Sequence, residues 1–198
     1  MERCCSRYAG QPVGLSGRGS GAAPGRYDAK RAVARRRVRR PLLDPQQGRL
    51  YSWEGQFKTI RTGAPLTPGR LHRLVRAISE LYGIKKPRLR AMNFNDRDGF
   101  QTFARSGSHD IEFSRKHAAH TPLIVAHEMA HVIQEQYGMY PQHSCHGKQF
   151  AGILAYILHR FGIMPTTAVL PSMRAAKVRY FHPYNCRPVR LKTWYKKC

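Results

Sequence analysis

Residues 121–138 read TPLIVAHEMAHVIQEQYG, and this stretch decides the fold. Thr121 can act as the N-cap of a helix, a proline suits the first helical position, and Gly138 can end the helix. Apolar residues on both sides of the central HEMAH indicate that most of this helix is buried. Within it, His127 and His131 are four positions apart, so both imidazoles lie one turn apart on the same face.

The pattern His-Glu-x-x-His is typical of sites in which a metal ion activates water. Two imidazoles one helical turn apart can bind one ion, and Zn2+ is the usual metal for this motif in hydrolytic sites. Glu128 follows the first histidine, so it can take a proton from water at the metal without binding the metal itself. We therefore predict His127 and His131 as zinc ligands and Glu128 as the general base. The alternative is a helix with two histidines and no metal.

A catalytic zinc ion needs a third protein ligand, and the sequence restricts where this ligand can lie. No Asp or Glu follows Glu135, so a glutamate from a later helix is excluded. The metzincin pattern is excluded as well, because Gln134 and Tyr137 occupy the positions that require glycine and histidine. The third ligand must then be a downstream His or Cys, or a residue from upstream. The downstream candidates are His143, Cys145, His146, His159 and His182.

Among these candidates we favour His146. Gly147 follows it, and a helix is expected over residues 147–161, so a ligand at the start of that helix can turn back toward the first two histidines. Phe150 can then pack the new helix against the histidine-bearing helix. His143, three residues earlier, is the rival third ligand.

Other periodic segments indicate an α+β domain. A helix is expected over residues 67–82, ended by Gly83, because its apolar positions recur with the helical period. Three short strands are expected at 88–94, 100–104 and 110–114, separated by turn-forming residues.

The chain is strongly basic, with a formal net charge of +24 from 35 Lys and Arg against 11 Asp and Glu. Residues 1–50 carry a net charge of +9, and residues 136–198 carry +10 without one acidic side chain. Such a field favours polyanions, above all nucleic acid. The alternative is a soluble basic protein without a specific polyanionic partner. Residues 1–50 also hold few large apolar side chains, so we predict a disordered tail there.

Two groups of cations are candidate nucleic-acid contacts. One is the arginine run of the basic tail. The other lies near the C-terminus, where cations alternate with aromatic side chains that can stack on bases, although these aromatics could instead pack on the domain. The predicted contacts are Arg36, Arg37, Arg39, Arg40, Lys177, Arg179, Arg190 and Lys192.

Cysteine usage and hydropathy indicate an intracellular protein, cytoplasmic or nuclear. The chain has five cysteines at irregular spacing and no C-x-x-C pair, which favours neither a zinc ribbon nor a disulfide framework. No stretch reaches the roughly 18–20 apolar residues of a membrane span, and the N-terminus lacks the apolar segment of a secretory signal. We expect no membrane association and a monomer.

The two motifs together resemble a known family. HEMAH, followed after a gap by HGKQF at residues 146–150, is similar to the H-E-x-x-H…H-G-x-x-F signature of the SprT-like (Spartan-related) zinc metallopeptidases. The strand at residues 111–114 also resembles the edge strand of that family. The resemblance covers roughly residues 67–162.

This resemblance implies a minimal zincin domain of gluzincin-like type, with a small sheet packed on the active-site helix. It implies that zinc is held by His127, His131 and His146, and that Glu128 is catalytic. Eukaryotic members of the family cleave proteins crosslinked to DNA, which the basic flanks of this chain would suit.

The sequence thus predicts a basic tail over 1–50, a zinc metallopeptidase domain over 51–165 and a basic aromatic extension over 166–198. The predicted activity is hydrolysis of peptide bonds in a protein substrate. Two alternatives stay open: a nucleic-acid-binding protein with a structural metal, in which Glu128 would have no use, and a zinc hydrolase of a non-protein substrate. The group that stabilises the oxyanion is left open among Tyr137, Tyr140, Tyr180 and His182.

Overall fold

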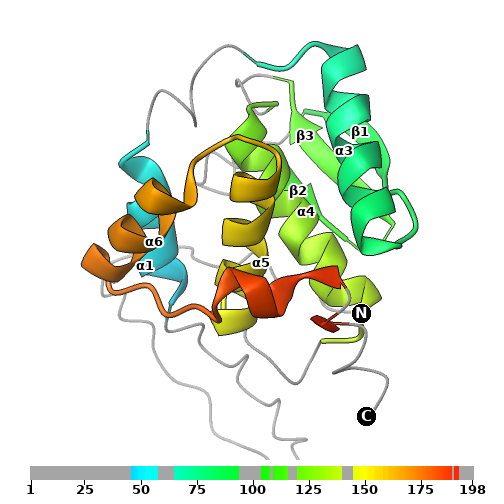
Figure 1. Ribbon diagram of the computed structural model, residues 1–198. Helices are drawn as coiled ribbons and strands as arrows, with labels where there is room; N and C mark the ends of the chain where they lie inside the picture. The colour runs from blue at the N-terminus through cyan, green and yellow to red at the C-terminus, as the bar shows by residue number, and fades with distance from the viewer. Residues whose placement is uncertain are drawn as a thin grey trace, which may run out of the picture.

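A computed structural model describes residues 46–57, 65–93, 104–107, 109–115, 120–139, 145–188 and 190–191. These parts form a mixed domain of helices and a small sheet (Figure 1). No helix within them combines the length and apolarity needed to cross a bilayer. In chain order the elements are α1 (Gln47–Gly55), α3 (Pro68–Tyr82), β1 (Arg88–Met92), β2 (Ala104–Ser106), β3 (Asp110–Ser114), α4 (Pro122–Gln136), α5 (Lys148–Arg160), α6 (Thr166–Ala175) and the 3-10 turn η2 (Pro183–Cys186).

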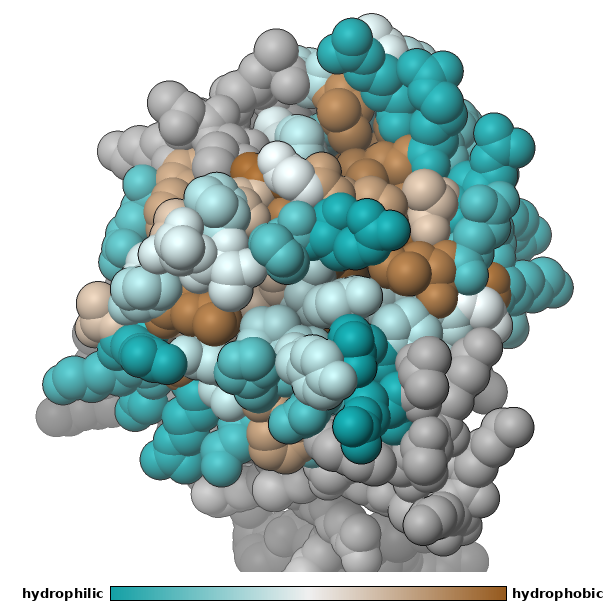
Figure 2. All heavy atoms as spheres, in the orientation of Figure 1, coloured by the Kyte–Doolittle hydropathy of each residue, from teal (hydrophilic) through white to brown (hydrophobic). Residues whose placement is uncertain are grey.

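Helix α3 matches its sequence prediction at both ends. The Oγ1 of Thr67 accepts a hydrogen bond from the backbone N–H of Arg70 at 3.4 Å, and Gly83 ends the helix in the left-handed region with φ 60°. Val75 and Ile78 on its inner face are fully buried. The opposite face is exposed and hydrophilic, at the right of Figure 2.

The sheet has the strand order β1-β3-β2, with β1 parallel and β2 antiparallel to β3. The resemblance implied an edge strand at residues 111–114, and this was wrong: β3 is the central strand of the described sheet. Ile111 and Phe113 are buried, which suits a central strand that packs on the core. Strand β3 has its expected bounds, whereas β2 lies at Ala104–Ser106, and residues 94 and 100–103 of the expected strands lie outside the described part of the chain.

Helix α4 is the central helix, and residues Leu123 to Gln134 are all buried. It contacts α3 on one side and α5 on the other, and it also lies against β2. Thr121 is the N-cap residue of α4, as predicted, but its Oγ1 is buried and makes no hydrogen bond with the described residues. The first turn is closed by the backbone, through Val125 N–H to the carbonyl of Thr121 at 3.0 Å.

Helix α1 shows that the folded domain begins before the predicted boundary at Tyr51. Leu50 and Trp53 are fully buried, and Trp53 Nε1 donates a hydrogen bond of 2.9 Å to the Oγ of Ser172 in α6. A nine-residue helix is not stable alone in water, so packing must hold it. Burial of one such leucine contributes about 1.5–3 kcal/mol. Residues 46–50 therefore belong to the domain and not to the tail.

The segment after residue 165, predicted as a C-terminal extension that could pack on the domain, does pack on it. Helix α6 contacts both α1 and α5, and η2 lies along α5. Gly152 of α5 permits this close approach, because a Cβ there would lie 2.6 Å from the backbone oxygen of Phe181. Backbone N–H of Phe181 also donates to the carbonyl of Lys148 at 2.9 Å.

Candidate metal centre

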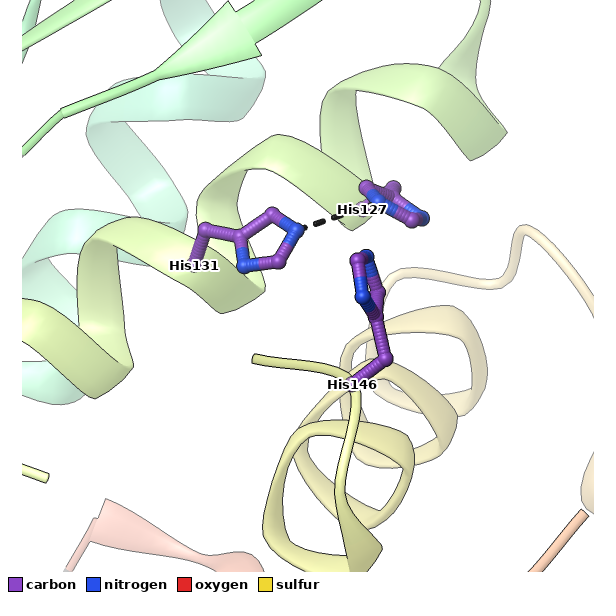
Figure 3. A group of neighbouring side chains, drawn as sticks. All are labelled: His127, His131 and His146. Atoms are coloured by element: carbon purple, nitrogen blue, oxygen red, sulfur yellow. Dashed lines mark hydrogen bonds between the residues drawn. The ribbon is translucent and has the colours of Figure 1, made fainter. Parts of the chain in front are cut away.

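Three buried histidines converge between α4 and the start of α5 (Figure 3). His127 and His131 come from α4, and His146 lies just before α5 and points toward them. One ring nitrogen from each lies within 4.8 Å of the other two, and the residues are 1–6 % exposed. The three histidines could therefore hold a metal ion.

The ring geometry fits a bound cation. Nε2 of His127 and Nε2 of His131 are 3.2 Å apart. Two Zn–N bonds of about 2.0–2.1 Å at a tetrahedral angle need a separation of about 3.3–3.4 Å. Burial, together with His146 and His127, holds the pKa of His131 well below its usual value, so this ring is in the neutral form that binds metal. Imidazole donors suit zinc, copper, iron and nickel, so the donors alone do not choose the metal.

Gln46 fixes the backbone that carries the third histidine. Its Nε2 donates to the carbonyl oxygen of His146 at 2.7 Å and to that of Arg179 at 2.8 Å. Its Oε1 accepts from the backbone N–H of Arg179 at 2.7 Å. This buried amide therefore joins three segments that are far apart in the sequence. It lies within residues 1–50, which the sequence placed in the tail.

Phe150 forms the inner wall of the site, as expected for the helix that follows His146. Its ring centroid lies 4.9 Å from that of His127, 4.4 Å from His131 and 5.0 Å from His146. Because Phe150 is fully buried, it excludes water from the inner side of the three rings.

Glu54 is a site residue that the sequence analysis missed. Its Oε1 lies 2.6 Å from Nδ1 of His127, and both side chains are buried. A carboxylate oxygen accepts from an N–H, so this contact suits the tautomer of His127 with its proton on Nδ1 and its lone pair on Nε2, which faces His131. No spacing pattern in the sequence marks a residue 73 positions before its partner.

Glu128 is buried beside the histidines. Among the described residues, its Oε2 has no hydrogen-bond partner. Burial raises the pKa of Glu128, while His127 and Ser106 act in the opposite direction and Glu54 raises it further. A buried carboxylate with a raised pKa and unused acceptor capacity is suited to take up a proton.

The other candidate ligands in the described part of the chain do not join the cluster. His159 is exposed near the end of α5. Nδ1 of His182 accepts from the backbone N–H of Tyr184 at 3.3 Å. Cys145 is half-buried next to His146 in the sequence and is not part of the group. The rival His143 lies outside the described residues.

The tyrosines considered for oxyanion stabilisation make other contacts. Tyr137 donates its hydroxyl to the carbonyl of Tyr82 at 2.8 Å. The hydroxyl of Tyr180 accepts from Nε of Arg174 at 2.9 Å. Tyr140 lies outside the described residues.

Of the candidate nucleic-acid contacts, the structure describes Lys177, Arg179 and Arg190, and all three are exposed. Nearby, Tyr184 is 49 % exposed, with the guanidinium carbon of Arg187 3.5 Å and that of Arg190 5.8 Å from its ring centre. The remaining candidates, Arg36, Arg37, Arg39, Arg40 and Lys192, lie outside the described residues.

Comparison of the chain with protein-family models, with curated proteins and with solved structures finds no match.

Proposed function

We propose that this chain is a zinc-dependent metallopeptidase of SprT-like type. The observation that carries the proposal is the convergence of His127, His131 and His146 beside the buried carboxylate of Glu128. A structural zinc site is closed by four protein ligands and has no use for a base. Three histidines next to a carboxylate with an unused oxygen instead match a hydrolytic site with one open position.

In this proposal each residue of the site has a separate role in peptide hydrolysis. Zinc, when bound, supplies Lewis acidity toward water and toward the peptide carbonyl. Glu128 takes the proton from the attacking water and can return it to the leaving amine. Glu54 keeps His127 in the tautomer whose Nε2 faces the cluster. Phe150 excludes water from the inner side of the rings.

The experiment compares the wild-type chain with Glu128→Gln on a basic DNA-binding protein, with and without DNA. We expect Glu128→Gln to keep its zinc and its fold while the cleavage rate falls about 10²–10⁴-fold. Glu80→Gln is the matched control, because Glu80 is exposed on α3, away from the histidines. Equal cleavage by wild type and Glu128→Gln would reject the proposed base.

If neither protein cleaves although both bind zinc, the result would favour one of the two alternative functions, a nucleic-acid-binding protein with a structural metal or a hydrolase of a non-protein substrate. A peptidase-inactive protein that binds DNA in a zinc-dependent way would indicate a structural metal. A zinc protein that hydrolyses small esters or amides but not proteins would indicate a non-protein substrate.

We also propose that the surface around Tyr184 contacts nucleic acid. An exposed aromatic ring with Arg187 stacked on it and Arg190 nearby offers both stacking and phosphate neutralisation. We expect DNA affinity that falls steeply between low and physiological salt, and a weaker salt dependence for Arg187→Ala/Arg190→Ala. An affinity that does not respond to salt would contradict this proposal.

A further inference from the structure

Tyr51 of α1 lies against the metal centre, although the sequence placed no functional residue in this helix. Its ring stacks on that of His127 with centroids 5.7 Å apart, and it meets His146 edge-on at 5.2 Å. Its hydroxyl oxygen is 3.4 Å from Nε2 of His146. Tyr51 therefore touches two of the three candidate ligands and brings a polar atom to the cluster.

Tyr51 also combines contact with the buried cluster and exposure to solvent. The residue is 38 % exposed, whereas the three histidines are 1–6 % exposed. A peptide that reaches the buried cluster from the side of this ring would bring its reacting carbonyl near the hydroxyl of Tyr51.

The helix holds Tyr51 in place before any substrate binds. Leu50 and Trp53 are fully buried on either side of it in the sequence, and Glu54 is bound to His127. The backbone at Tyr51 is thus fixed to the same framework as the histidine cluster. A donor held in advance needs no reorganisation at the moment of reaction, which is the condition for electrostatic stabilisation of a developing charge.

We propose that Tyr51 is a further catalytic residue of this site. Its hydroxyl donates a hydrogen bond to the carbonyl oxygen of the scissile peptide and keeps its own proton. The bond strengthens as the carbonyl carbon becomes tetrahedral and negative charge collects on the oxygen. This inference rests on the proposed peptidase function. Tyr51 is the tyrosine whose hydroxyl lies beside a candidate ligand, whereas the hydroxyls of Tyr137 and Tyr180 bind Tyr82 and Arg174.

The test is Tyr51→Phe in the full zinc-loaded chain, which removes only the hydroxyl. We expect its zinc content, zinc affinity and melting temperature to match wild type. We expect kcat to fall about 10²–10³-fold with KM within a few-fold, the effect of removing one oxyanion donor. Tyr180→Phe is the matched control, since its hydroxyl binds Arg174, and it should keep wild-type kcat.

A second readout does not depend on turnover. A phosphinate analogue of the peptide that wild type cleaves carries tetrahedral oxygens in place of the reacting carbonyl. Calorimetry should show that Tyr51→Phe binds this phosphinate much more weakly than wild type does. In a Glu128→Gln background, which does not cleave, the uncleaved peptide should bind equally well with or without Tyr51→Phe.

Two results would contradict the role of Tyr51 without contradicting the proposed peptidase function. The first is wild-type kcat and wild-type phosphinate affinity in Tyr51→Phe, while Glu128→Gln is inactive. The second is loss of zinc in Tyr51→Phe, which would make the hydroxyl part of the metal-holding group. If wild type cleaves no faster than Glu128→Gln, the proposed function itself fails and the assignment of Tyr51 fails with it.

Discussion

The carboxylate of Glu54 lies 2.6 Å from Nδ1 of His127, although 73 residues separate the two in the sequence. This contact ties helix α1 to helix α4 at the candidate metal centre. It favours the tautomer of His127 that is protonated at Nδ1, and it leaves Nε2 to face His131. Helix α1 is therefore part of the site and not merely a neighbour of it.

Glu54→Gln should weaken zinc binding about 10–100-fold, because the amide no longer orients His127 or increases its basicity. Competition with a chromophoric chelator measures the affinity. Glu80→Gln, on the exposed face of α3, should bind zinc as wild type does. Unchanged affinity in Glu54→Gln would mean that the contact is structural only.

His146→Ala should lose stoichiometric zinc, whereas His143→Ala should retain about one zinc per chain. The physical reason is that His146 completes the cluster with His127 and His131. Metal analysis of the purified variants decides between them. Retained zinc in His146→Ala together with lost zinc in His143→Ala would move the third ligand to His143.

Gly152→Ala should destabilise the fold by on the order of 1–3 kcal/mol, because the added methyl meets the backbone oxygen of Phe181. Gly48→Ala is the control: a Cβ there meets nothing within 4 Å, and the change should stabilise helix α1 by about 0.4–1 kcal/mol. Denaturant unfolding of both variants measures the difference. A Gly152→Ala protein as stable as wild type would show that the segment around Phe181 can move away from α5.

The buried thiol of Cys186 should make the protein less stable in alkali. Burial raises the pKa of Cys186 from 9.0 to about 12, so the folded protein keeps a proton that the unfolded chain releases. Stability from this group is fully present below pH 9 and is lost as pH rises toward 12, by up to about 1.4 kcal/mol per pH unit.

Urea unfolding of wild type and Cys186→Ala between pH 7 and pH 11 tests this expectation. At pH 7 the free energy of unfolding of Cys186→Ala should be lower than that of wild type, because the substitution leaves a cavity. Above pH 9 the variant should lose less stability than wild type does. Part of the alkaline loss should persist in the variant, since the pKa of buried Tyr82 is also raised, chiefly by burial. Parallel curves for the two proteins would contradict the role of the thiol.

Helix α4 and its ligand pair could be predicted from the sequence because the necessary information is local. A spacing of four places two histidines on one helix face wherever that helix packs. The information that ends helices at Gly83 and Gly138 is equally local, because each glycine itself adopts a positive φ. His146 could be favoured because it lies at the start of the next helix.

Local patterns failed for α1 and α6. Helix α1 is short, and its only buried apolar residues are Leu50 and Trp53. Two positions are too few to reveal a helical period next to a basic tail. Helix α6 was not predicted within the C-terminal extension, because only Val169 and Met173 are buried along it. In both cases packing against distant residues decides the structure.

The sequence alone was enough to predict the side chains of the candidate site: two histidines and a glutamate on one buried helix, with a third histidine to follow. The residues that surround these side chains depend on tertiary packing. Glu54 contacts His127, which is 73 positions away in the sequence. Tyr51 and Gln46 contact His146, which is 95 and 100 positions away from them. Such contacts have no period or spacing to reveal them, because they exist only once burial of apolar side chains has docked α1 against the rest of the domain.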